Sequence, residues 1–197
     1  PVPPTATATR TSTATATAAS TATPMPTSTL APTPTPATFI AQHDGFTDNL
    51  LPSQNFGALN SLFTRASSGS FRFGYFKFAV AGLSGGVRSA TLRLYVVDGT
   101  AGTGSVYPTS NDFSTGGAWT ENALVWDNQP AVIGPMLSSF SGLPSGTDRD
   151  FDVTAAVTGN GTFSFLLRTL TADQAEFATH EATLAEQRPR LIVVPLP

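Results

Sequence analysis

From Phe39 to the end of the chain, short apolar runs alternate with polar residues and are separated by Gly, Pro, Asn and Asp. A period of two is typical of β-strands, and many short strands divided by turn residues indicate a sandwich or barrel. In residues 71–78 the alternation places Tyr75 and Lys77 on one face and Phe76 and Phe78 on the other, so both faces carry rings. We predict strands over residues 61–66, 71–78, 88–97, 103–107, 149–154, 161–169, 174–180 and 190–195. Helical periodicity is nearly absent, which predicts an all-β antiparallel sandwich.

The first 38 residues have a different composition from the rest of the chain. They are almost entirely Thr, Ser, Ala and Pro, and Arg10 is their only charged residue. Threonine occupies every odd position from Thr5 to Thr17, a strand-like period that would put hydroxyls along one edge and small side chains along the other. The prolines that follow favour extended polyproline II. We therefore predict an extended low-complexity Thr/Ala/Pro tail over 1–38 and one folded domain over 39–197.

The tail has the composition of O-glycosylated extracellular segments, which are rich in Ser, Thr and Pro. This indicates a secreted or cell-surface protein with covalently attached glycans. The candidate attachment residues are Thr5, Thr7, Thr9, Thr11, Thr13, Thr15, Thr17, Thr21, Thr23, Thr27, Thr29, Thr33 and Thr35.

Asn160-Gly161 lies between two apolar positions, and this dipeptide favours a type I′ hairpin turn. With Thr162 it also forms an Asn-Gly-Thr sequon, so Asn160 is a candidate for N-glycosylation.

Charge and cysteine content exclude several classes of protein. The net charge is −3 and the arginines are scattered, which argues against nucleic acid and anionic membranes as partners. The chain has no cysteine, so neither a disulfide framework nor a thiolate metal site can form. No apolar run approaches the roughly 20 residues that span a bilayer. We predict no membrane insertion.

The domain resembles the DNRLRE family, extracellular modules of which some are classed as carbohydrate-binding modules. The resemblance rests on short blocks in a fixed order, at residues 44–46, 55–57, 75–78, 89–95, 119–121, 124–126, 128, 130, 151–154, 177–182 and 189–191. It implies a jelly-roll β-sandwich on a secreted protein. The chain departs from the family pattern at His180, where an arginine is expected before Glu181.

Candidate groups for catalysis are scattered, and no spacing links them. They are His43, Asp44, Glu121, Asp150, Asp152, Glu176, His180 and Glu181. Adjacent pairs such as His180-Glu181 would point to opposite faces of a strand. We predict neither an enzyme nor a cofactor. Calcium stays an alternative through oxygen ligands such as Asp44, Asp48 or Asp112, although the chain has no EF-hand spacing.

Two functions remain open. The first is a structural one, in which copies of the chain polymerise into a glycosylated extracellular filament, each domain accepting a neighbour's tail as an added strand. The second is a non-catalytic carbohydrate-binding module on a flexible stalk, with polysaccharide as partner. Sugars stack on exposed aromatic faces, and the candidates for such a platform are Trp119, Trp126 and Tyr75. We favour the filament at this point.

Overall fold

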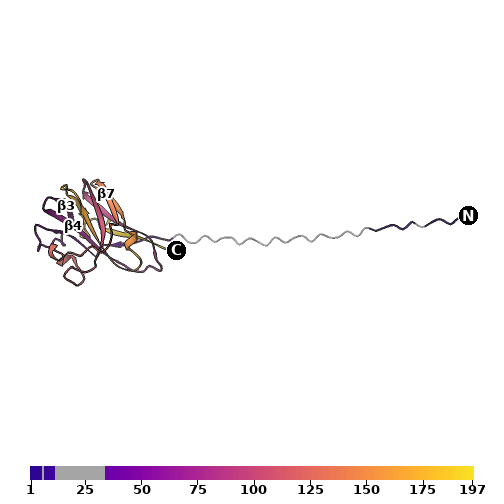
Figure 1. Ribbon diagram of the computed structural model, residues 1–197, viewed down its shortest axis with the longest axis horizontal. Helices are drawn as coiled ribbons and strands as arrows, with labels where there is room; N and C mark the ends of the chain where they lie inside the picture. The colour runs from indigo at the N-terminus through magenta and orange to yellow at the C-terminus, as the bar shows by residue number, and fades with distance from the viewer. Residues whose placement is uncertain (6, 12–33) are drawn as a thin grey trace. The chain divides into compact units, whose positions relative to one another are not determined.

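The computed structural model describes residues 1–5, 7–11 and 34–197 (Figure 1). The chain divides into two compact units, Pro1–Ala31 and Pro32–Pro197. The described residues of the first unit form no helix or strand, and their side chains are exposed. Among the described residues, no helix has the length and apolar character needed to cross a membrane.

The second unit is built from antiparallel strands and short 3-10 turns. Its regular elements are β1 (Ala37–Ile40), β2 (His43–Asp48), β3 (Ser61–Ser67), β4 (Ser70–Val80), β5 (Val87–Asp98), β6 (Thr100–Thr109), η1 (Glu121–Ala123), η2 (Trp126–Asn128), β7 (Ser138–Leu143), β8 (Thr147–Asp152), η3 (Thr154–Ala156), β9 (Gly161–Thr169), β10 (Ala175–Ala178), η4 (Ala185–Gln187) and β11 (Arg190–Pro195). The prediction of an all-β antiparallel sandwich is confirmed.

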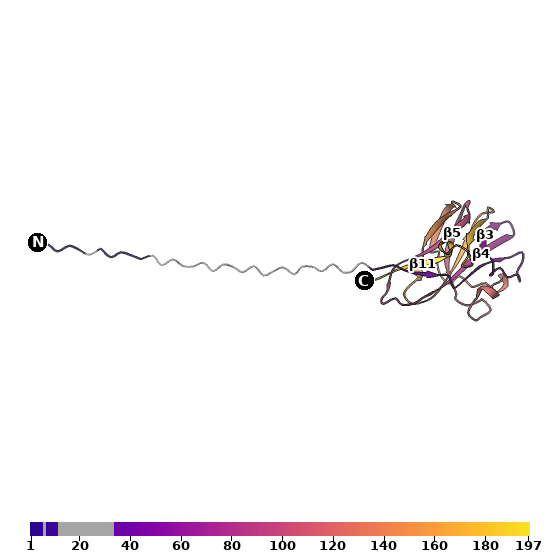
Figure 2. The same cartoon turned by 180° about the vertical axis from the view of Figure 1, so that it is seen from behind.

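The strands form two layers that share β3. In the first layer β5 pairs with β8 on one side and with β11 and β10 on the other, and β1 extends the layer beside β11. Figure 2 labels β5 and β11 of this layer. In the second layer β4 pairs with β2 and β3 on one side and with β9 on the other, followed by β6 and β7. The first half of β3 pairs with β10 and its second half with β4, so one strand joins both layers.

The main core lies between the layers. Phe76 and Phe78 of β4 pack there with Leu92 and Leu94 of β5, and all four side chains have no exposed surface. Close packing of this kind makes the two layers one folding unit.

The outer face of β4 and β9 is covered by the long connection between β6 and β7, residues 110–137, here called the covering loop. Trp119 and Leu124 of this loop form a second apolar cluster with Tyr75 and Leu166. The Trp119 indole donates a hydrogen bond to Ser164 Oγ at 3.0 Å. Both faces of β4 are thus buried, which explains the rings on both faces of its sequence.

Asn160-Gly161 does not form the predicted type I′ hairpin. That turn needs positive φ at both central residues, but no described residue other than glycine has positive φ. Gly161 instead begins β9, and the element before it is η3 rather than a strand. The Asn160 side chain accepts a hydrogen bond from Leu83 N and donates one to Leu83 O, both at 2.9 Å. Asn160 therefore acts as a side-chain bridge to a distant loop.

Candidate functional site

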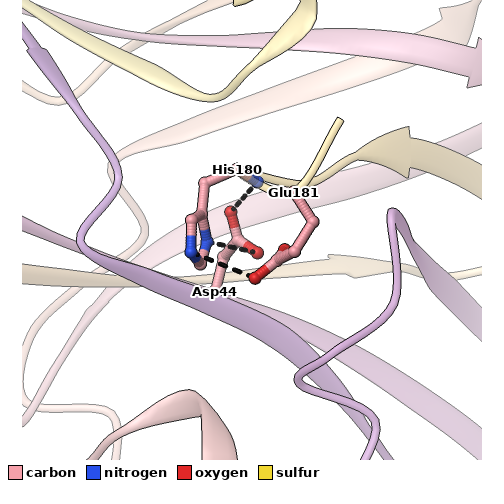
Figure 3. A group of neighbouring side chains, drawn as sticks. All are labelled: Asp44, His180 and Glu181. Atoms are coloured by element: carbon pink, nitrogen blue, oxygen red, sulfur yellow. Dashed lines mark hydrogen bonds and ion pairs between the residues drawn. The ribbon is translucent and has the colours of Figure 1, made fainter. Parts of the chain in front are cut away.

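Asp44, His180 and Glu181 converge on the second layer and form what we call the acid–imidazole trio (Figure 3). Asp44 lies on β2, whereas His180 and Glu181 lie in the turn that follows β10. The turn is closed by a hydrogen bond from Ala182 N to Thr179 O at 3.1 Å. One ligand-type atom from each of the three side chains lies within 4.8 Å of the other two.

The turn explains why two neighbours in sequence share one site. Strand β10 ends at Ala178, earlier than the predicted end at residue 180. Because His180 and Glu181 are outside the strand, their side chains need not alternate, and His180 Nε2 lies 3.0 Å from Glu181 Oε1. The sequence-based objection to this pair was therefore wrong.

Glu121 borders the trio from η1. Its Oε2 atom lies 3.5 Å from His180 Nε2 and 3.5 Å from His43 Nδ1. The adjacent residues His43 and Asp44 have different partners: His43 reaches Glu121, and Asp44 reaches His180. Five of the eight residues considered for catalysis thus lie in one neighbourhood.

Burial and hydrogen bonding make Asp44 unusual. Its side chain has no exposed surface; Oδ2 accepts a hydrogen bond from His180 N at 2.8 Å, and Oδ1 has no hydrogen-bond partner. Desolvation raises the pKa of Asp44 to about 6, against the opposing effect of His180. The carboxylate of Asp44 in turn raises the pKa of His180.

Two contacts hold the backbone of Glu121 beside the trio: a side-chain anchor and a close backbone approach. Asn55 Nδ2 donates hydrogen bonds to Glu121 O at 2.6 Å and to Leu124 O at 2.8 Å. A Cβ atom on Gly57 would lie 2.2 Å from Glu121 O, so only glycine fits beneath η1. Segment 55–57 therefore fixes the position of the η1 backbone.

A second candidate surface is a row of three rings, Phe71 and Phe73 on β4 and Trp126 on η2, here called the aromatic row. Ring centroids lie 6.3 Å apart for Phe71 and Phe73 and 5.2 Å apart for Phe73 and Trp126. Phe71 is 37% exposed, and the other two rings are half-buried. This surface combines aromatic rings from two elements with access to solvent.

The loop after β2 borders the aromatic row. Asn49 exchanges two hydrogen bonds with the backbone of Phe71, at 3.2 Å and 2.6 Å. At its other end this loop meets η2, where Asp127 N donates to Pro52 O at 3.2 Å and Ser53 Oγ donates to Asp127 Oδ2 at 3.4 Å. Polar side chains therefore lie next to the rings.

The predicted sugar-stacking residues divide between the core and the surface. Trp119 is 0% and Tyr75 is 1% exposed, so neither ring offers a face to a ligand, and we no longer assign them to stacking. Trp126 is half-buried and belongs to the aromatic row. Phe71 and Phe73 were not proposed from the sequence; their shared strand face with Tyr75 was the signal that could have found them.

The carboxylates suggested for calcium do not come together. Asp44 belongs to the trio, and Asp48 forms an ion pair with Arg72 at 2.8 Å and accepts a hydrogen bond from Leu50 N. Asp112 lies in the covering loop, bridged to Ala118. Asp150, Asp152 and Glu176 also lie apart from the trio: Asp150 pairs with Arg93, Asp152 accepts from Thr154, and Glu176 lies on β10.

The predicted glycan residues are only partly covered by the structure. Thr5, Thr7, Thr9, Thr11, Thr35 and Asn160 are exposed. The remaining candidates, Thr13, Thr15, Thr17, Thr21, Thr23, Thr27, Thr29 and Thr33, lie outside the described residues. Glycosylation stays a prediction for all of them.

Comparison with known protein families identifies the family of this chain. The family model for carbohydrate-binding module family 96 matches residues 35–194. The chain belongs to this family. The match covers nearly all of the strand-rich unit and supports a carbohydrate-binding module, although it does not single out the DNRLRE family. Members of such families are non-catalytic binding modules and are typically extracellular. No curated protein matches the chain.

Proposed function

We propose that this domain binds a polysaccharide without catalysis, and that the sugar stacks on the aromatic row. The supporting observation is the solvent-accessible alignment of Phe71, Phe73 and Trp126 on a carbohydrate-binding module. Aromatic faces attract the apolar C–H faces of sugar rings, while nearby polar groups hydrogen-bond the hydroxyls. Asn49, Ser53 and Asp127 are the polar groups next to this row.

A wide hollow elsewhere on the domain supports the same choice by contrast. It has a volume of about 690 Å³, and none of its lining residues is aromatic. Those residues are Gly99, Thr100, Ala101, Ser141, Gly142, Leu143, Pro144, Ser145, Arg149 and Asp173. A site without rings offers hydrogen bonds that water also supplies, whereas the aromatic row adds apolar contact area.

We propose further that the protein is exported and that the Thr-rich segment is a glycosylated stalk for the binding domain. The family match and the composition of residues 1–38 favour this arrangement. The filament hypothesis, with copies of the chain and tail docking, gains no support from the described residues. Between the two hypotheses, the binding module has the better foundation.

The test is binding to a panel of neutral and acidic polysaccharides, measured by affinity electrophoresis and by calorimetry with soluble oligosaccharides. We expect at least one polysaccharide to bind, and Trp126→Ala and Phe73→Ala each to lower the affinity about 10-fold or more. Tyr95→Ala is the matched control, since Tyr95 is a half-buried ring on β5, in the other layer.

Circular dichroism would establish that each variant is folded before its affinity is compared. If no polysaccharide in the panel binds, the proposed function is wrong. If one binds and Trp126→Ala keeps the full affinity while Tyr95→Ala loses it, the function stands but the aromatic row is not the site.

A further inference from the structure

The neighbourhood of the acid–imidazole trio contains more buried polar atoms without a hydrogen-bond partner than an ordinary structural ion pair would leave. Five buried atoms in this neighbourhood have no hydrogen-bond partner: His43 Nδ1, Asp44 Oδ1, Glu121 Oε2, His180 Nδ1 and Glu181 Oε2. An unpartnered buried polar atom is costly, and a group of them in one place points to a bound water or ion. Asp44 gives the clearest signal because its side chain is completely buried.

A proton on His180 accounts for only one of the contacts in this neighbourhood. Charge-assisted N–H···O hydrogen bonds measure about 2.7–2.9 Å. Here His180 Nε2 lies 3.0 Å from Glu181 Oε1, but Nδ1 lies 3.4 Å from Asp44 Oδ1, and Glu121 Oε2 lies 3.5 Å from Nε2. Only the contact with Glu181 approaches hydrogen-bond length, and the buried Asp44 Oδ1 keeps no hydrogen-bond partner.

The three side chains also lie close enough together to share one cation. In a tetrahedral site with bonds of about 2.0–2.2 Å, neighbouring ligand atoms lie about 3.3–3.6 Å apart. One ligand atom from each of Asp44, His180 and Glu181 lies within 4.8 Å of the other two, so small side-chain rotations would bring the set to this spacing. His180 would use only one nitrogen, because Asp44 Oδ1 lies 3.4 Å from its Nδ1 and Glu181 Oε1 lies 3.0 Å from its Nε2. The carboxylates also outnumber the imidazole of the trio, so a divalent cation would balance their charge.

We infer that Asp44, His180 and Glu181 bind a divalent transition-metal ion of the Zn²⁺ class, with Glu121 as the nearest additional carboxylate. Imidazole together with carboxylate is a ligand set for zinc and its neighbours, whereas calcium takes six to eight oxygen ligands. His180 and Glu181 side chains are 25% and 27% exposed, which leaves the ion a route from solvent. The ion would join β2 to the turn after β10. The proposal does not depend on carbohydrate binding.

The test is metal binding to the full chain, purified without a histidine tag and treated with chelator. The chain has no cysteine and only two histidines, so competing zinc ligands are few. Zn²⁺, Mn²⁺ and Ca²⁺ would each be titrated alone by calorimetry, with elemental analysis after dialysis. We expect one Zn²⁺ per chain and, at about 100 times the Kd, a rise in Tm of roughly 5–10 °C.

Glu181→Gln and His180→Gln remove a ligand while keeping the size of the side chain, and both should weaken zinc binding about 10-fold or more. The matched control is Glu176→Gln, a half-buried carboxylate on β10 outside the trio, which should bind zinc like the wild type. Circular dichroism of the metal-free variants checks their folding. Absence of zinc binding, a preference for Ca²⁺, or unchanged affinity in Glu181→Gln would each overturn the inference.

Discussion

Replacing Trp119 with alanine tests whether the covering loop is held by its buried indole. The ring has no exposed surface and packs in a cluster with Tyr75, Leu124 and Leu166. It also donates to Ser164 Oγ, and Lys77 Nζ lies 4.9 Å from its centroid while donating to Trp119 O at 2.5 Å. Trp119→Ala therefore removes a ring, a hydrogen bond and a cation–π contact together.

The magnitude follows from these contacts. Truncating a buried Trp to Ala costs about 3–5 kcal/mol, and a hydrogen bond contributes about 1 kcal/mol net. We expect the free energy of unfolding to fall by about 4 kcal/mol, a large share of the roughly 5–15 kcal/mol of a typical domain. Trp126→Ala should cost less than about 2 kcal/mol because its ring is only half-buried.

The assay is urea unfolding followed by far-ultraviolet circular dichroism, because the chain has only two tryptophans and each variant removes one fluorophore. The free energies of unfolding of wild type, Trp119→Ala and Trp126→Ala would be compared, and the comparison requires that the three m-values agree. A loss below about 1 kcal/mol in Trp119→Ala, or a larger loss in Trp126→Ala, would refute the assignment of Trp119 to the packing of the loop.

Two further substitutions test the support of η1 and a surface ion pair. Gly57→Ala should lower Tm, since the new Cβ would collide with Glu121 O, whereas Gly159→Ala, with nothing within 4 Å, should change it little; differential scanning calorimetry compares them. A hydrogen bond from Arg93, chiefly, lowers the pKa of Asp150. The Arg93–Asp150 pair therefore stabilises the fold fully above the ordinary pKa of an aspartate carboxyl. This stabilisation is lost as the pH falls through the lowered pKa of Asp150. Urea titrations at pH 7 and pH 3 should show a smaller pH dependence for Asp150→Asn than for wild type; an equal dependence would contradict this assignment.

The sequence predicted the strands that carry clear alternation, and β3, β4, β5 and β9 form close to the expected positions. It missed β1, β2 and β7. Strand β2 was missed because Asp44 and Asp48 interrupt its apolar pattern, yet both carboxylates are buried. Their partners, His180 and Arg72, come from other elements, so local sequence cannot reveal that these acids belong in a strand.

Local sequence could not predict the acid–imidazole trio either, for two reasons. Asp44 and His180 are 136 positions apart, and only the closure of the sandwich brings them together. His180 and Glu181 were expected in a strand, and the early end of β10 places them in a turn instead. The family resemblance did single out position 180, where histidine replaces an expected arginine. An arginine there would supply a fixed charge, whereas histidine offers a nitrogen that can bind a metal.

Trp126 of the aromatic row and Glu121, which borders the trio, lie on the same covering loop, and one short segment supports both. Residue Trp126 of the row sits in η2, whose backbone is bound by Pro52. Glu121 sits in η1, whose backbone is bound by Asn55 and fits closely over Gly57. Since segment 52–57 fixes both turns, an ion at the trio that also bound Glu121 would restrain the same segment that positions Trp126. Metal binding would then favour the polysaccharide-binding arrangement by reducing the freedom of the loop rather than by touching the sugar.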